Sequence, residues 1–130
     1  MNEAMLRKVL WIDATTCIAS GLLMTAGASA LAPVLGLPET FLRGSGLALF
    51  PVAAFIAAVA LKAVRSMAAV SLVVAGNLVW VVGSFWVIDG GVHHPTTAGV
   101  AFTLAQAAGV LVLAALETRG ALALRSTEAT

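Results

Sequence analysis

Four long apolar runs, separated by short segments rich in glycine, proline or charged residues, dominate the chain. Each run has about the 20 residues that an α-helix needs to cross the hydrocarbon core of a bilayer. The runs cover residues 9–29, 47–64, 68–88 and 98–116. Residues 30–46 are punctuated by prolines yet remain apolar, which predicts an outer loop lying in the membrane interface. The pattern predicts an all-α polytopic membrane protein, an up-down bundle of four transmembrane helices, with residues 1–130 forming a single domain.

The composition agrees with lipid as the main solvent. Of the 130 residues, 61% are hydrophobic and 10% are charged, whereas a soluble domain has about 25% charged residues. A net charge of +1 gives no basic surface of the kind that attracts nucleic acid. Cys17 is the only cysteine, so the chain forms no internal disulfide.

The distribution of basic residues predicts the orientation in the membrane. With four spans, one side receives six of the seven Lys and Arg residues: Arg7, Lys8, Lys62, Arg65, Arg119 and Arg125. Arg43 alone falls on the other side. Because basic loops stay in the cytoplasm, we expect both termini to be cytoplasmic. The first run also resembles a cleaved signal peptide, but its length and its aspartate favour a retained span.

One carboxylate lies inside the first run, at Asp13. A charge in hydrocarbon costs several kcal/mol, so the carboxylate must find a polar partner, become protonated or reach the headgroups. Counted from residue 9, Asp13 lies near the cytoplasmic end, where Lys62 and Arg65 can reach it by snorkelling. Ser71 can donate a hydrogen bond at the same level. These positions favour an ion pair or an interfacial anchor over a proton relay.

Two amides lie near the middle of their runs, Asn77 in the third and Gln106 in the fourth. Amides commonly hydrogen-bond across membrane helices, so a structural Asn77–Gln106 bond is favoured over substrate binding. Trp80 shares a helix face with Asn77 and is either a packing residue or the wall of a pocket. The candidate intramembrane polar site comprises Asp13, Ser71, Asn77, Trp80 and Gln106.

His93 and His94 are the only residues that resemble metal ligands, with Asp89 nearby. Two adjacent imidazoles in a flexible loop are a weak signal, and a solvated loop is the favoured interpretation. No cofactor is expected. We find no nucleophile–base pair or metal set, so we expect no enzymatic activity.

Small residues recur along three of the predicted helices and permit close helix approach. They form three lines: Gly21/Thr25, Gly76/Gly83 and Gly99/Gly109. Four short helices do not obviously need so many. The leading prediction is therefore a non-enzymatic bundle that acts as an accessory, scaffold or oligomeric subunit, in a homo-oligomer or a larger membrane complex, with the lipid bilayer as its other partner.

The alternative is a small transporter or lipophilic-ligand binder. In that case Asp13 is a proton-coupled or cation-binding carboxylate, and Asn77, Trp80 and Gln106 line the pocket. The sequence does not identify the ligand.

A scattered set of residues also carries a resemblance to a family. The set comprises Asp13, Gly36-Leu37-Pro38, Leu42-Arg43, Gly46, Pro51, Asn77, Trp80, Thr97, Gly99, Gln106-Ala107 and Leu116-Glu117. Together they resemble a family of small uncharacterised bacterial four-helix integral membrane proteins, over nearly the whole chain. The resemblance implies a four-helix fold in a bacterial inner membrane and carries no activity.

Overall fold

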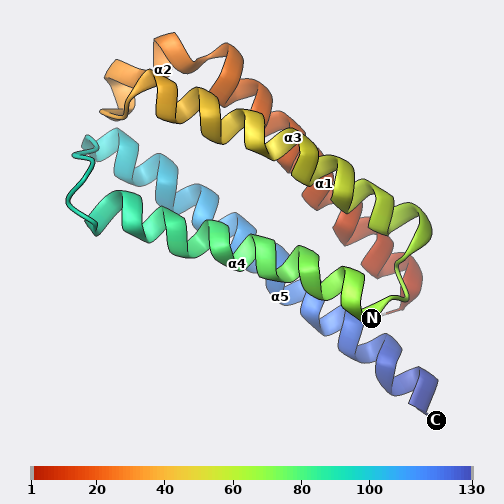
Figure 1. Cartoon of the computed structure of the whole chain (residues 1–130). Helices are drawn as coiled ribbons and strands as arrows, with labels where there is room; N and C mark the ends of the chain where they lie inside the picture. The colour runs from red at the N-terminus through yellow and green to blue at the C-terminus, as the bar shows by residue number, and fades with distance from the viewer. Residues whose placement is uncertain (1, 130) are drawn as a thin grey trace.

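A computed structural model describes residues 2–129, and the side chains of residues 2–125. It contains five α-helices in the described range: α1 (Glu3–Ala26), α2 (Ala28–Leu35), α3 (Glu39–Lys62), α4 (Met67–Asp89) and α5 (Thr97–Ala129) (Figure 1). Four of them, α1, α3, α4 and the Thr97–Arg125 part of α5, are long and apolar enough to cross a membrane. The structure therefore confirms the all-α class and the four long apolar helices.

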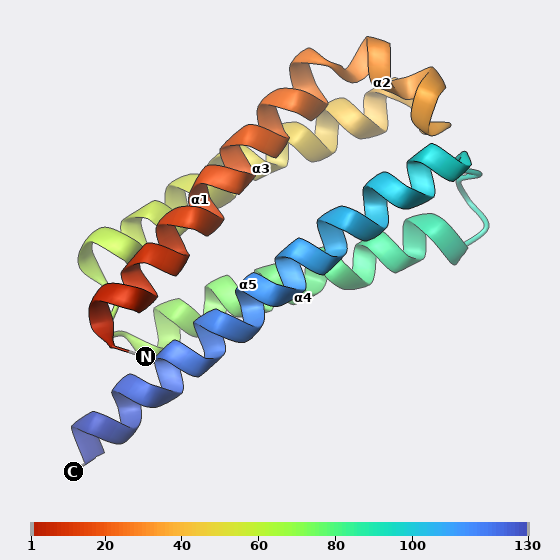
Figure 2. The ribbon, with the colours of Figure 1, turned by 180° about the vertical axis from the view of Figure 1, so that it is seen from behind.

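The long helices form two layers. In both views α1 lies along α3, and α4 lies along α5 (Figures 1 and 2). Between the layers α1 contacts α5, whereas α3 and α4 hardly touch each other. Both ends of the chain lie at the same end of the bundle, and the short helix α2 lies at the opposite end (Figure 1).

The α1–α3 layer is held by a close approach of the two backbones. A Cβ atom added to Gly46 of α3 would lie 2.9 Å from Met24 Cβ and 2.9 Å from Thr25 Cγ2. A Cβ atom on Gly21 of α1 would lie 3.0 Å from the Gly46 carbonyl oxygen. These distances leave no room for a side chain, so the Gly21/Thr25 line is a helix contact, as its spacing predicted.

Most of the expected outer loop is helical. Residues 28–35 form α2, which ends at Gly36 in the left-handed conformation (φ 69°) that glycine adopts without strain. Pro38 precedes the first residue of α3, Glu39, which forms an i,i+4 ion pair with Arg43 at 2.8 Å. Such a pair supports a helix, so α3 begins eight residues before the predicted run and continues into it without a break.

The first and last helices are also longer than predicted. Asn2 caps α1, since its Oδ1 accepts a hydrogen bond from the Met5 backbone N–H at 2.9 Å, and the helix therefore begins at Glu3 rather than at residue 9. The last helix continues past residue 116 to Ala129 through a segment rich in alanine and leucine, which are strong helix formers. Both extensions change which polar residues of neighbouring helices lie side by side along the bundle.

Candidate functional site

Three polar side chains from three helices meet in the interior. The Asn77 Nδ2 atom on α4 donates to Asp13 Oδ2 on α1 and to Glu117 Oε1 on α5, each at 2.8 Å. The exposed fractions of Asp13, Asn77 and Glu117 are 1%, 6% and 0%. This carboxyl cluster therefore connects the two layers through buried hydrogen bonds.

The carboxyl cluster has more hydrogen-bond acceptors than donors. An amide nitrogen carries two hydrogens, and Asn77 uses both on the two carboxyl groups. Glu117 Oε2 has no hydrogen-bond partner among the described residues. The Cys17 thiol, a weak donor, lies 3.8 Å from Asp13 Oδ1. The arrangement can therefore accept one more positive group, either a proton or a cation.

The helix lengths explain why these residues meet. Asp13 and Asn77 each lie about ten residues, or roughly 15 Å, from the first residue of their helices. Both helices begin at the same end of the bundle, where Arg65 Nη2 lies 2.8 Å from Glu3 Oε2. Counting from residue 9 instead of Glu3 placed Asp13 too close to the start of its helix. The aspartate is in fact near the middle of α1.

The position of Asp13 near the middle of α1 means that its partners differ from the expected ones. Arg65 bonds Glu3 through both Nε, at 2.9 Å, and Nη2. The side chain of Lys62 is exposed, and Ser71 is exposed on α4. The expected ion pair with Lys62 or Arg65 and the hydrogen bond from Ser71 are therefore wrong, because all three lie nearer the end of the bundle than Asp13 does.

The expected amide pair is also wrong. Both N–H groups of Asn77 are engaged by carboxyl groups, and the Gln106 Nε2 atom lies 3.7 Å from Met24 Sδ on α1. Gln106 thus forms a second polar contact between the layers, separate from the carboxyl cluster.

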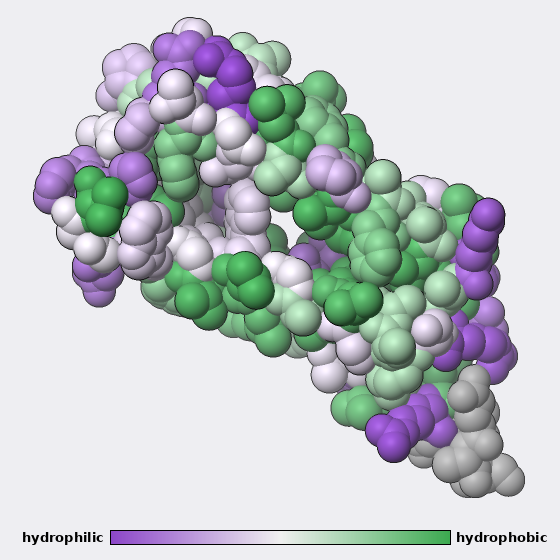
Figure 3. Space-filling view, in the orientation of Figure 1, coloured by the Kyte–Doolittle hydropathy of each residue, from purple (hydrophilic) through white to green (hydrophobic). Residues whose placement is uncertain are grey.

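A cavity of about 730 Å³ lies between the two layers. The predicted pocket residues Asp13, Asn77, Trp80 and Gln106 all line it, together with residues of α3. Figure 3 shows an opening between the side chains of the two layers. The cavity extends from Asp13 and Asn77 toward the α2 end, where Phe41 belongs to its wall. Asp13 and Asn77 of the carboxyl cluster therefore line one end of the cavity, and most of the remaining wall is apolar.

Glycines help to create this space. Gly76, Gly83 and Gly109 line the cavity, and a Cβ atom added to any of them would meet nothing within 4 Å. Gly99, in contrast, packs against the Leu35 carbonyl, which leaves no room for a Cβ atom. The expected contact lines through Gly76/Gly83 and Gly109 are therefore not contacts within the chain, because these residues face open space.

Aromatic residues lie at the α2 end of the cavity. The ring centroid of His93 is 4.8 Å from that of Phe41 and 5.8 Å from that of Trp86, and both of those partners line the cavity. His94, its neighbour, is exposed. Within the described residues no group of three or more His, Cys, Asp or Glu side chains is placed to hold a metal ion.

Glu117 is the site residue that the sequence prediction missed. The predicted fourth run ended at residue 116, so Glu117 was placed at the membrane edge. Its spacing from Thr103, Gln106, Gly109 and Leu113 nevertheless puts it on the same helix face. That face, continued past the end of the apolar run, was the signal that could have identified it.

No protein-family model, curated protein or solved structure matches the chain. Its class is defined by the fold and the site alone. The chain is an all-α protein with four helices apolar enough to cross a membrane. It has a buried Asp–Asn–Glu cluster, of which Asp13 and Asn77 line one end of a cavity between the layers.

Proposed function

We propose that the protein binds a lipophilic cation in the cavity between its layers, as a small membrane transporter or ligand-binding membrane protein. The observation that carries the proposal is a buried carboxyl group, Asp13, in the wall of a largely apolar cavity, with a second buried carboxyl group, Glu117, joined to it through Asn77. Apolar walls favour the hydrophobic body of a ligand. The one acceptor of the carboxyl cluster that has no partner among the described residues, Glu117 Oε2, favours a positive group near the cluster.

When no cation is bound in the cavity, a proton binds the carboxyl cluster instead. Two unpaired carboxylates in a low-dielectric interior repel each other, and desolvating them costs several kcal/mol. One shared proton lowers that cost and supplies the missing donor for Glu117 Oε2. Binding of a cation then releases the proton, so that binding of the cation and of the proton are coupled.

The membrane setting follows from the same charges and helices. We place the four apolar helices across a bacterial inner membrane, with both termini cytoplasmic because six of the seven basic residues lie at that end. The sides of the cavity then face lipid, and a lipophilic ligand reaches it from the bilayer. The protein acts without enzymatic chemistry.

The test uses tetraphenylphosphonium as the probe, with binding measured by equilibrium dialysis of the protein in nanodiscs. Gly83→Leu fills the cavity and is expected to weaken binding at least about tenfold, which is 1.4 kcal/mol. Gly44→Leu is the matched control, because Gly44 is also a helical glycine with nothing within 4 Å of its added Cβ but does not line the cavity. Equal binding by Gly83→Leu and the wild type contradicts the proposal.

The carboxyl cluster is tested separately by Asp13→Asn, which keeps the shape of the side chain and removes its charge. We expect it to weaken cation binding at least about tenfold. Thr15→Asn is a suitable control, because Thr15 is exposed on the same helix and does not line the cavity. Unchanged binding by Asp13→Asn would show that the cavity does not use its carboxyl cluster for charge recognition.

A scaffold or oligomeric subunit is the second candidate function. It is favoured by the open faces at Gly76, Gly83 and Gly109, against which a helix of another copy can pack. Mass photometry in nanodiscs distinguishes the two candidates. If Gly83→Leu dissociates an oligomer that Gly44→Leu leaves intact, and cation binding is absent from both the wild type and the variants, the scaffold function is supported.

A further inference from the structure

A second pocket lies at the end of the bundle that carries the termini, far from the α2 end. It has a volume of about 350 Å³ and is formed where the α3–α4 connection meets the last turns of α5. Its apolar wall includes Val64, Val70, Ala121 and Leu124, each at most 9% exposed. The wall is therefore part of the core, and the pocket reaches inward from the surface.

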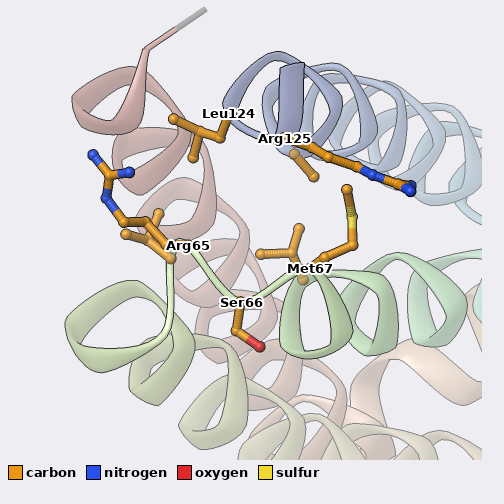
Figure 4. A pocket seen from close by; sticks show the side chains of 8 residues that line it. Arg65, Ser66, Met67, Leu124 and Arg125 are labelled. Atoms are coloured by element: carbon orange, nitrogen blue, oxygen red, sulfur yellow. The ribbon is translucent and has the colours of Figure 1, made fainter. Parts of the chain in front are cut away.

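Two arginines border this apolar wall. Arg65 and Arg125 lie on opposite sides of the pocket, with Ser66 and Met67 between them (Figure 4). The Arg65 guanidinium bonds Glu3, with Nη2 and Nε at 2.8 and 2.9 Å from Oε2, and this bond fixes its position at the rim. Arg125 is exposed. The positive end of the α4 dipole is also directed here, since Ser66 is the N-cap of that helix.

These features select an anionic amphiphile. A guanidinium binds a phosphate through charge-assisted hydrogen bonds, and an apolar wall beside it accommodates an acyl chain. Arg7, Lys8 and Lys62 are at the same end of the bundle and add to the positive potential there. A neutral lipid gains nothing from these charges, and a small hydrophilic anion gains nothing from the wall.

We propose that this pocket is a binding site for one anionic phospholipid, whose phosphate contacts Arg125 and whose acyl chain lies against Val70, Ala121 and Leu124. The lipid would fill the space between α4 and the end of α5 and hold the two helices together at the headgroup level. This site is separate from the cavity between the layers and does not depend on the function proposed for that cavity.

The experiment is native mass spectrometry of protein released from nanodiscs that contain equal amounts of phosphatidylglycerol and phosphatidylcholine. The wild type is expected to retain one phosphatidylglycerol, and Arg125→Gln is expected to reduce that retention at least about fivefold. Arg119→Gln is the matched control, because Arg119 is another exposed arginine of α5 that does not line the pocket. Equal losses in the two variants, or no loss in either, overturn the proposal.

A second pair of variants tests the pocket rather than the charge. Ala121→Phe fills the pocket without changing any charge and is expected to lose the lipid, whereas Ala115→Phe, on an exposed face of α5, is expected to keep it. If Ala121→Phe folds with unchanged helicity and keeps the lipid, the lipid binds the surface and not the pocket. Millimolar inorganic phosphate should not displace the lipid, and displacement would identify a phosphate site instead.

Discussion

Glycines line two regions of this molecule, a close contact between two helices and an open cavity between the two layers. Between α1 and α3, Gly21 and Gly46 lie opposite each other, and an added Cβ atom on either would come within about 3.0 Å of the other helix. Between the two layers, Gly76, Gly83 and Gly109 face space in which an added Cβ atom meets nothing within 4 Å. The same residue type thus brings two helices together in one region and opens a cavity in the other.

The difference comes from what lies opposite each glycine. In the α1–α3 contact the partner helix also presents a glycine, so both backbones can approach. In the cavity, Trp80 and Phe102 belong to the wall together with the glycines, and both pack against the core. No atom of another helix lies within 4 Å of the Cβ position of Gly76, Gly83 or Gly109, so these glycines leave a void. A line of small residues on one helix therefore does not by itself predict a helix contact.

The largest expected effect is on stability at the α1–α3 contact. Gly46→Leu should destabilise the fold by about 3 kcal/mol, because overpacking a tight interface forces the backbones apart. Gly83→Leu should change stability by less than about 1 kcal/mol, since the cavity accepts the side chain and leucine favours a helix. Unfolding in mixed detergent micelles, followed by tryptophan fluorescence, measures both. Similar losses in the two variants would remove the distinction between the contact and the cavity.

The next largest effect concerns the carboxyl cluster. Asn77→Leu should cost about 2–3 kcal/mol, because two buried carboxyl groups lose their amide donor. Gln106→Leu is the matched control on the neighbouring helix and should cost less than about 1 kcal/mol, since it loses only a weak contact with Met24. A double-mutant cycle with Glu117→Leu should show that the Asn77 effect shrinks when one carboxyl group is absent. Additive effects would mean that the two residues are not coupled.

A smaller effect is expected where the layers meet near α2. The Thr96 Oγ1 atom donates to the Val34 carbonyl at 2.6 Å and accepts from the Gly99 backbone N–H at 3.1 Å. Thr96→Ala removes both bonds and should cost about 1 kcal/mol, as the loss of a helix N-cap does. Thr96→Ser keeps the hydroxyl and serves as the control in the same unfolding assay. A loss as large for serine as for alanine would point to the methyl group rather than to the cap.

The smallest effect is expected for the Glu3–Arg65 ion pair, which lies at the end of the bundle where α1 and α4 begin. Glu3 is also within 3.2 Å of Arg7, and all three side chains are partly exposed. Glu3→Gln should therefore cost at most about 1 kcal/mol, and the difference from the wild type should shrink in 1 M salt, because exposed pairs are weak and screened. A loss well above about 1 kcal/mol that does not change with salt would contradict this expectation, because it would show that solvent does not screen the ion pair.

Much of the site could be predicted from local pattern. Periodicity gave the helical class and the four apolar helices, and the residues Asp13, Asn77, Trp80 and Gln106 do line one cavity. The levels at which they meet could not be predicted, because they depend on where each helix begins and ends. Because α1 begins directly after the cap at Asn2, Asp13 lies near the middle of that helix. Because α5 continues past residue 116, Glu117 lies within it and shares Asn77 with Asp13.

The cavity could not be predicted for a different reason. Whether Gly76 and Gly83 form a contact or a wall depends on side chains of other helices, which no local pattern records. The identity of the charged partner of the cluster is thus the point on which the account depends most.

The most direct measurement is the proton balance of cation binding. Tetraphenylphosphonium is added to the purified protein in weakly buffered detergent, and a pH indicator reports the protons released for each cation bound. We expect release of about one proton per cation from the wild type and from Gly44→Leu, and none from the Asp13→Asn, Glu117→Gln double variant. Cation binding with no proton release, or undiminished release from the double variant, would contradict it.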